Sequence, residues 1–382
     1  MKIAGLASTI VLAALAASAM TSTAKAQTVF PPLEAGKFLQ DCGAPDAAPD
    51  ICRAREAVSA AEAKRRLGDQ DVAMWRKGDR FRVVARNPAE VVSLAGGLAA
   101  PMARIDGTDL WSFTARIPRL DEAVIDFLVI PSADQPPLTA WRGPKAPPAA
   151  AFNPELKGQV VWDEVDSPAL GEKRTLTVYL PPDFDRTRTY PVAYVADGSG
   201  VAYYARIVEP AIVAGRLPPV VLVGLESGAK RTTDYLLGWE ASDAGFEKHE
   251  AFLLNEVMPR AERLYGASSR REQRLLIGKS NGGAWALDTA LRHPDLFAQA
   301  APMALGAGRA AGVDRPGRPR LFMATGVLDS FIRRSRVVAE RAAKSGDELV
   351  FRTPVSGHGD VFYQDLLVEA LAWAFGGGVR PS

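Results

Sequence analysis

The feature that most constrains the fold of this chain is a strand that runs through a Gly-x-Ser-x-Gly motif into a helix. Apolar residues 275–277 lead into residues 278–282, with Ser280 at the centre, and the helical pattern 284–291 follows. Small residues on both sides of Ser280 allow a turn tight enough to hold it in a strained conformation with its hydroxyl exposed. This context predicts a nucleophile elbow. The alternative is a glycine-rich turn with an incidental serine.

Apolar strand patterns alternate with helical patterns throughout the second half of the chain. Strands are predicted at residues 175–180, 192–195, 220–223, 274–277, 320–324 and 349–354, and helices at 203–214, 247–265, 283–293, 333–345 and 364–375. This alternation predicts a parallel sheet covered by helices on both faces. Together with the elbow, it predicts an α/β-hydrolase domain over residues 159–380.

The first half of the chain has strand patterns with no long helical period between them. They cover residues 80–85, 91–94, 111–117 and 123–130, and turn-forming pairs such as Asn87-Pro88 and Gly96-Gly97 separate them. This spacing predicts a small all-β, immunoglobulin-like sandwich over residues 69–138. The Pro- and Ala-rich residues 139–158 predict a semi-rigid linker.

Residues 1–26 have the layout of a secretory signal peptide. Lys2 precedes an apolar run over residues 3–20, and Ala24-Lys25-Ala26 forms a small-residue cleavage site before Gln27. An uncleaved membrane anchor is the alternative, because the run is about as long as the shortest spanning helix. No later segment approaches that length, so we expect a periplasmic or secreted protein that begins at Gln27.

Both cysteines of the chain lie in the N-terminal extension, residues 27–68. Cys42 and Cys52 are close in sequence, and an exported protein meets oxidising conditions, so we expect them to form a disulfide. A metal site is not expected, because no histidine is near either cysteine. After the pair, residues 53–67 predict a helix that ends at Gly68.

The charge balance excludes a broad nucleic-acid-binding surface. The chain has 46 Lys and Arg against 44 Asp and Glu, a net charge of +2. The balance is uneven, since residues 260–344 contain sixteen Lys and Arg and seven Asp and Glu, a local net of +9, which leaves −7 for the rest. Solvated helix faces would explain this excess, and an anionic substrate is the other explanation.

A serine nucleophile needs a base, and the chain has three histidines. His249 lies among charged residues on a helical pattern, which predicts a surface position, and His293 ends the helix after the elbow. His358 lies in a glycine-rich loop after the last strand and follows Ser280 in the order usual for hydrolase folds. We therefore expect His358 to be the general base, with an ordinary loop histidine as the alternative.

The acid that orients the histidine should lie between Ser280 and His358 at the end of a strand. Asp329 meets both conditions, because it follows the strand at residues 320–324. Its alternative role is to cap the helix that begins near Phe331. Asp347 and Asp360 are the reserve candidates.

An oxyanion hole requires two backbone amides. Asn281, the residue after the nucleophile, should provide one. The loop after the strand at residues 192–195 should provide the other, from Ser199 or, one residue away, from Gly198. A plain glycine-rich turn is the alternative for this loop.

The second domain resembles the esterase family that includes enterochelin esterase, its periplasmic relatives, feruloyl esterases of the esterase D group and mycobacterial mycolyltransferases. The matching segments are residues 174–182, 190–198, 217–224, 231–235, the elbow, 293–297, 325–329 and 356–358. The resemblance places the family's serine, acid and histidine at Ser280, Asp329 and His358. Residues 101–111 are similar to the N-terminal immunoglobulin-like domain of the enterochelin esterase group. Lys279 departs from the family pattern, because the family commonly has an uncharged residue there. The signal peptide is a second departure from that pattern.

The resemblance implies a serine carboxylic-ester hydrolase that needs no metal or organic cofactor, and the signal-peptide layout adds the expectation that it is exported. With the basic region, the resemblance favours an anionic small-molecule ester such as a ferric catecholate siderophore, and Arg231 and Lys279 are the candidate contacts. A structural ion pair and a solvated side chain are their respective alternatives. Rival functions are a feruloyl or acetyl esterase on plant polysaccharide, an acyltransferase, and a hydrolase-fold binding protein without catalysis. The sequence indicates no oligomeric state.

Overall fold

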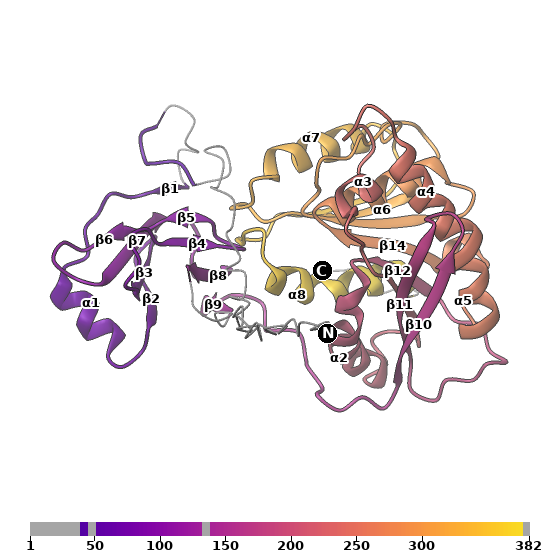
Figure 1. Cartoon of the computed structure of the whole chain (residues 1–382), viewed down its shortest axis with the longest axis horizontal. Coiled ribbons are helices and arrows are strands. Elements are labelled where there is room, and N and C mark those ends of the chain that lie inside the picture. Colours follow the sequence, from indigo (N-terminus) through magenta and orange to yellow (C-terminus); the bar gives the residue numbers. More distant parts are fainter. Residues whose placement is uncertain (1–38, 45–50, 132–137, 377–382) are drawn as a thin grey trace, which may run out of the picture. The chain divides into compact units, whose positions relative to one another are not determined.

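The computed structural model describes residues 39–44, 51–131 and 138–376. The predicted signal peptide lies outside these ranges. The described residues form a β-sandwich, built from β1 to β9 and called the sandwich below, and an α/β domain that begins at β10 (Figure 1). Within the described part of the chain, no helix has the length and apolar character to cross a membrane.

The sandwich consists of two antiparallel sheets. The five-stranded sheet has the order β1-β7-β3-β2, with β6 also paired to β7, and contains β1 (Cys52–Arg53), β2 (Val72–Lys77), β3 (Arg80–Arg86), β6 (Ala103–Arg104) and β7 (Leu110–Arg116). The four-stranded sheet has the order β5-β4-β8-β9 and contains β4 (Ser93–Ala95), β5 (Ala100–Pro101), β8 (Val124–Ile130) and β9 (Thr139–Arg142). Inward-facing residues of both sheets, such as Phe81, Phe113 and Phe127, form one apolar core.

Two boundaries in this region differ from the sequence expectation. Strand β9 lies inside the predicted linker and pairs with β8, so the sandwich extends to Arg142. The helix expected over residues 53–67 is shorter, because α1 spans only Ala60–Leu67. Ser59 caps it by accepting a hydrogen bond from the Glu62 amide at 3.2 Å, and Cys52–Arg53 pairs with β7 instead.

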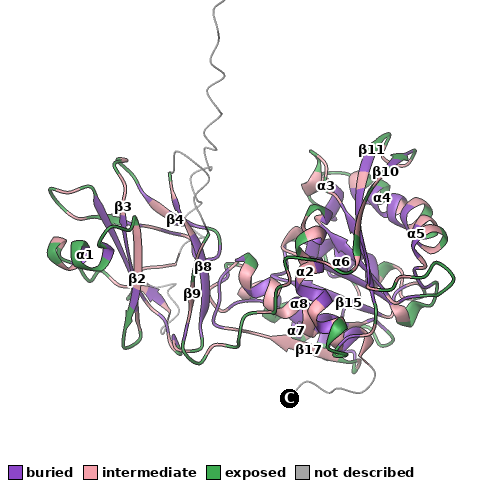
Figure 2. Cartoon of the chain, turned by 90° about the horizontal axis from the view of Figure 1, so that it is seen from below, coloured by how far each residue is buried: buried purple, intermediate pink, exposed green. Residues whose placement is uncertain are grey.

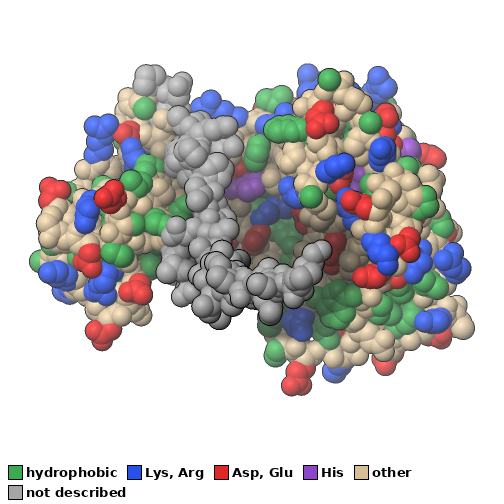
Figure 3. Space-filling view, in the orientation of Figure 1, with side chains coloured by type: hydrophobic (Ala, Val, Ile, Leu, Met, Phe, Trp, Pro, Cys, Tyr) green, Lys and Arg blue, Asp and Glu red, His purple; other side chains and the backbone are tan. Residues whose placement is uncertain are grey.

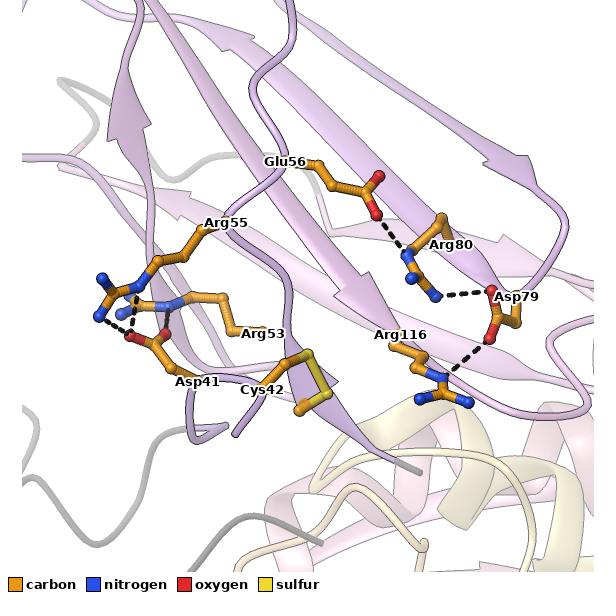
Figure 4. Close-up of a disulfide and its surroundings, with 9 residues drawn as sticks. Asp41, Cys42, Arg53, Arg55, Glu56, Asp79, Arg80 and Arg116 are labelled. Carbon is orange, nitrogen blue, oxygen red and sulfur yellow. Dashed lines mark hydrogen bonds and ion pairs between the residues drawn. A yellow bond between two sulfur atoms is a disulfide. The ribbon is translucent and has the colours of Figure 1, made fainter. Parts of the chain in front are cut away.

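The expected disulfide between Cys42 and Cys52 is present. It joins residues 39–44 to the edge strand β1, and Asp41 beside it binds two guanidinium groups (Figure 4). Arg53 Nε lies 2.5 Å from Asp41 Oδ1, and Arg55 Nη2 lies 2.8 Å from Oδ2. These hydrogen bonds, that of Arg53 first, lower the pKa of the Asp41 carboxyl to about 2. The disulfide and this ion cluster hold the N-terminal extension against the sandwich.

The α/β domain is built on an eight-stranded sheet with the order β10-β11-β13-β12-β14-β15-β16-β17. Its strands are β10 (Gln159–Ser167), β11 (Glu172–Leu180), β12 (Val192–Ala196), β13 (Val221–Leu225), β14 (Arg274–Lys279), β15 (Gln299–Met303), β16 (Arg320–Ala324) and β17 (Leu349–Arg352). The strands from β13 to β17 are parallel, whereas β10 and β11 are antiparallel to their neighbours. The expectation of a purely parallel sheet is therefore wrong at this edge.

Helices cover both faces of this sheet, because alternate residues of each strand point to opposite sides. Val178 and Tyr194 join the core formed with α4, α5 and α6, and their neighbours Tyr179 and Val195 join the core formed with α2 and α8. Most of each inner strand is buried (Figure 2). The helices are α2 (Val201–Val213), α3 (Arg231–Tyr235), α4 (Ala244–Phe252), α5 (Met258–Tyr265), α6 (Asn281–Arg292), α7 (Ile332–Ala343) and α8 (Asp360–Phe375). This arrangement agrees with the predicted α/β-hydrolase fold.

The basic excess of residues 260–344 is balanced in three dimensions by carboxylates from outside that segment. The pairs are Arg260 with Asp163, Arg292 with Glu250, Arg309 with Asp243 and Arg320 with Glu348, at N–O distances of 2.6, 2.8, 3.0 and 3.1 Å. Figure 3 accordingly shows basic and acidic side chains interspersed over the visible face. The excess of positive charge in residues 260–344 therefore does not form a basic surface.

The prediction of a surface position for His249 is wrong. Its ring is fully buried and lies 5.2, 6.0 and 5.7 Å from the rings of Tyr235, Phe252 and Trp285. The three-residue spacing of Phe246, His249 and Phe252 puts them on one helix face, while Glu247 and Lys248 are exposed. Neither ring nitrogen has a hydrogen-bond partner among the described residues. Burial lowers the pKa of His249 to about 3.

His249 should make the folded state sensitive to acid. Between pH 6.5 and 3 the unfolded chain binds a proton at this position and the folded chain does not, so stability falls as the pH falls, by up to about 1.4 kcal/mol per pH unit. We expect His249→Phe to remove this contribution. Between pH 7 and 4.5 the variant should lose about 2 to 3 kcal/mol less unfolding free energy than the wild type, measured by urea denaturation. Equal losses would contradict the assignment, because the two chains share every other titrating group.

Candidate active site

Ser280 occupies a strained turn between β14 and α6. Its φ and ψ are 59° and −126°, a conformation that non-glycine residues rarely adopt. The backbone around it is fixed by hydrogen bonds: the Ser280 amide donates to the Met303 carbonyl at 2.9 Å, and the Ser280 carbonyl accepts from the Gly306 amide at 2.9 Å. The surrounding structure therefore holds the serine in the conformation that a nucleophile elbow requires.

The motif glycines are explained by close approach of neighbouring atoms. A Cβ at position 278 would lie 2.4 Å from the Gly282 carbonyl oxygen, and one at position 282 would lie 2.7 Å from Ala196 Cβ. These distances are shorter than van der Waals contact, so side chains at either position would force the elbow apart. The sequence interpretation of the glycines agrees with the geometry.

His358 and Asp329 are in direct contact. His358 Nδ1 lies 2.8 Å from Asp329 Oδ2, and Asp329 is 2% exposed. The other carboxylate oxygen of Asp329 accepts a hydrogen bond from the Phe331 amide at 2.8 Å. One oxygen of Asp329 thus binds the imidazole, and the other stabilises the turn that leads into α7.

The residues next to Ser280 and His358 are also joined. Lys279, which precedes Ser280, forms an ion pair with Asp360, which is two residues beyond His358. The strands β14, β16 and β17 run in the same direction, so the segments that follow them meet at one edge of the sheet. The reserve acid Asp347 precedes β17, at the opposite end of that strand, and accepts hydrogen bonds from the Gly317 and Arg318 amides.

The loop after β12 is held by the ion pair between Arg231 and Asp197. Arg231 Nε lies 2.5 Å from Asp197 Oδ1, and Nη2 lies 2.7 Å from Oδ2. The Asp197 amide donates to the Tyr235 hydroxyl at 3.0 Å, and Asp197 itself is left-handed, with φ 55°. Ser199 lies in the short helical turn that follows. In the described part of the chain, the Ser199 and Asn281 amides have no hydrogen-bond acceptor.

The two cations expected to contact substrate both have carboxylate partners. Arg231 binds Asp197 in the bidentate geometry just described, which is the structural ion pair that the sequence left open. Lys279 binds Asp360 and is 23% exposed, so its side chain is not simply solvated. Neither residue is an unpaired cation, so they give no support for an anionic substrate.

Aromatic side chains extend from the Ser199 loop and were not singled out in the sequence. Gly200 lies against the ring of Tyr204, whose centroid is 5.5 Å from that of Tyr363. Tyr203, 44% exposed, has its ring 5.2 Å from that of Phe152, which is 47% exposed. No sequence period marks these residues, because they come from the segment before β10, from α2 and from α8.

A protein-family model matches the segment of the chain that contains Ser280. Residues 167–311 match the family model described as "Putative esterase". This match covers part of the α/β domain and supports an esterase. The matched residues include Ser280 and the Ser199 loop, whereas Asp329 and His358 follow the matched segment. The family match supports a carboxylic-ester hydrolase.

Solved structures share the fold over most of the chain. The enterobactin esterase of Shigella flexneri, crystallised in the presence of enterobactin, is 17% identical, with a TM-score of 0.62 over 83% of this chain and 98% of that one. The ferric enterobactin esterase of Salmonella typhimurium is 16% identical, with a TM-score of 0.64 over 80% and 96%. A feruloyl esterase module from Clostridium thermocellum, 18% identical, covers 62% of this chain and 94% of that module, with a TM-score of 0.50. The α/β-hydrolase fold is thereby confirmed, while the immunoglobulin-like type of the sandwich stays a prediction.

The contact between Asp329 and His358 yields a test by conservative substitution. In Asp329→Asn the amide oxygen can still accept from the Phe331 amide, but the amide nitrogen would face His358 Nδ1 and favour the tautomer whose Nε2 carries a proton. We expect kcat for a p-nitrophenyl ester to fall by about 10⁴-fold, with little change in the melting temperature. Retention of more than a tenth of the wild-type kcat would contradict this role.

Proposed function

We propose that this protein is a serine carboxylic-ester hydrolase with Ser280 as nucleophile, His358 as general base and Asp329 as the orienting acid. The observation that best supports the proposal is the 2.8 Å contact between His358 Nδ1 and the buried Asp329 carboxylate. The ion pair between Lys279 and Asp360 links the segment of this contact to that of Ser280, which is held at positive φ within the residues that match the esterase family model. Each of these features has an ordinary structural explanation alone, but together they form a nucleophile, its base and the group that orients the base.

The proposed reaction proceeds through an acyl-enzyme. Ser280 Oγ attacks the ester carbonyl carbon while His358 Nε2 takes the hydroxyl proton, and the imidazolium then donates that proton to the departing alkoxide. Water attacks the acyl-enzyme, His358 takes its proton, and the proton returns to Ser280 Oγ as the carboxylic acid leaves. Asp329 stays ionised and stabilises the imidazolium in both halves of the reaction.

The oxyanion would be stabilised by the Asn281 amide and by an amide of the loop after β12. Asn281 is the first residue of α6, so its N–H lies at the positive end of the helix dipole. Ser199 is our choice for the second donor, with Gly198 as the alternative. In this proposal Arg231 holds the loop through Asp197 and does not itself contact the substrate.

Ser280→Ala tests the proposed mechanism. We expect kcat for a p-nitrophenyl ester to fall by at least about 10⁴-fold, because the nucleophile is lost while the fold is kept. The matched control is Ser269→Ala, an exposed serine near the opposite end of β14, which should keep full activity. A fluorophosphonate probe should label the wild type and not the Ser280 variant. An unlabelled, inactive wild type would favour the rival interpretation of a hydrolase-fold binding protein.

For the substrate, we propose an ester whose acyl groups contain aromatic rings, of the ferric catecholate siderophore class. The likeness to enterobactin esterases extends over 80% or more of this chain, against 62% for the feruloyl esterase module. The exposed rings of Phe152 and Tyr203, connected to the Ser199 loop through Tyr204, would give such acyl groups an aromatic surface.

A panel of esters tests this substrate class. We expect kcat/KM for a trilactone of catecholate-acylated serine to exceed that for methyl ferulate and p-nitrophenyl acetate by at least about tenfold, and Tyr203→Ala should raise KM for the trilactone more than for the acetate. A preference for the ferulate or the acetate would favour the polysaccharide esterase instead. Transfer of the acyl group to an added alcohol in preference to water would favour the acyltransferase.

We also propose that the protein is exported to the periplasm or secreted. The signal-peptide layout of residues 1–26 and the disulfide between Cys42 and Cys52 support this location, because disulfides persist in oxidising compartments. The mass of the chain recovered from a bacterial periplasm should correspond to a start at Gln27. A full-length chain in the membrane fraction would favour the uncleaved anchor.

A further inference from the structure

Asp126 is a buried acid in the sandwich that contacts the α/β domain. It lies in β8, between the apolar residues Ile125 and Phe127, and is 1% exposed. Its Oδ2 accepts hydrogen bonds from the amides of Asp360 and Val361, at 2.8 and 3.1 Å. These are the first two residues of α8, so Asp126 caps this helix from a strand 234 positions earlier in the chain.

The loop between β17 and α8, residues 353–359 and called the His358 loop below, touches the sandwich at a second point. The His358 amide donates to the Gly97 carbonyl at 3.0 Å. A Cβ at position 357 would lie 1.5 Å from the Gly97 oxygen, and one at position 359 would lie 1.6 Å from Asp126 Oδ1. The glycines on both sides of His358 therefore allow the loop to approach the Gly97 backbone and the Asp126 carboxylate closely.

Apolar contacts also join the sandwich to the loop that contains Asp329. Val355 of the His358 loop is buried in the core of the sandwich, and Val327 and Leu328, just before Asp329, pack against the same core. The Val124 amide of β8 donates to the Val355 carbonyl at 2.9 Å. The core of the sandwich, to which β8 belongs, thus supports both the His358 loop and the segment just before Asp329.

The cap has a physical consequence for the imidazole. The first amides of a helix have no partner within the helix, and leaving them unpaired in a buried place is unfavourable. Without the Asp126 carboxylate, the first turn of α8 would loosen or turn to reach water. His358 is two residues before that turn, so its position relative to Ser280 would be lost with it. A displacement of about 1 Å at a reacting group can cost about 100-fold in rate.

We propose that Asp126 is a positioning residue for the general base: by accepting the Asp360 and Val361 amides it fixes the His358 loop in the reactive arrangement. The proposal rests on the proposed function, in which His358 is the base. In this proposal the His358 loop is fixed by an acceptor oxygen of Asp126 and not by the negative charge of its carboxylate. The sandwich then has a role in catalysis that does not depend on contact with the substrate.

Two variants of Asp126 and one matched control test this role. Asp126→Ala removes the acceptor, and we expect kcat to fall by about 10- to 100-fold with KM within twofold of the wild type. Asp126→Asn retains an acceptor oxygen and should keep kcat within about threefold. The control is Glu209→Ala in α2, which removes another buried carboxylate that accepts two consecutive amides, those of Lys157 and Gly158. It should lower the melting temperature by a similar amount and leave kcat unchanged.

Three kinetic outcomes would overturn the proposal. Full kcat in Asp126→Ala would show that the cap is dispensable, and an equal loss of kcat in Glu209→Ala would show a general effect of destabilisation. An Asp126→Asn variant as slow as Asp126→Ala would show that the charge matters and not the acceptor oxygen.

Hydrogen–deuterium exchange separates this proposal from the proposed function. Peptides covering residues 355–363 should exchange at least about tenfold faster in Asp126→Ala than in the wild type, and at wild-type rates in Glu209→Ala. This readout needs no substrate, so it tests the junction even if no ester is hydrolysed. Unchanged exchange in an enzyme whose activity depends on Ser280 would overturn the positioning role alone. Inactivity of the wild type with faster exchange in Asp126→Ala would overturn the proposed function and leave the structural contact established.

Discussion

The parallel strands β14, β16 and β17 end at one edge of the sheet, and the candidate active site depends on this shared edge. Ser280, Asp329 and His358 each follow one of these strands within a few residues, so the sheet brings them together although they are far apart in the sequence. Interstrand hydrogen bonds and the apolar cores on both faces hold the strands in register.

This edge is also where the two parts of the described chain meet. Asp126 and Gly97 of the sandwich bind backbone amides in and just after the His358 loop, and Val355 completes the core of the sandwich. The loop on the other side of the elbow is held within the α/β domain by the ion pair between Arg231 and Asp197. Both loops that flank Ser280 are therefore fixed by buried or partly buried polar contacts.

Local patterns predicted much of this site from the sequence. The elbow depends on small residues at fixed spacing, and His358 is the predicted base because it is the one histidine of the three that follows a terminal strand. The failures have equally local causes. His249 lies among charged residues but points the other way, into an aromatic cluster. Strand β15 contains three small or imino residues, Ala300, Ala301 and Pro302, and has no strong strand pattern. Asp126 has a visible signal in the sequence, because it is the single acid inside the apolar run at residues 123–130, but no local pattern indicates that it caps α8.

By itself the sequence determined the α/β class of the second half of the chain and the strained turn at Ser280, because periodicity and turn chemistry act over a few residues. Only the tertiary structure decided which charges pair: Arg231 with Asp197, Lys279 with Asp360, and the basic segment 260–344 with acids outside it. It also decided that an acid of the sandwich caps α8. Such contacts depend on how elements far apart in the chain pack together, and a net charge counted along the sequence contains no information about that packing.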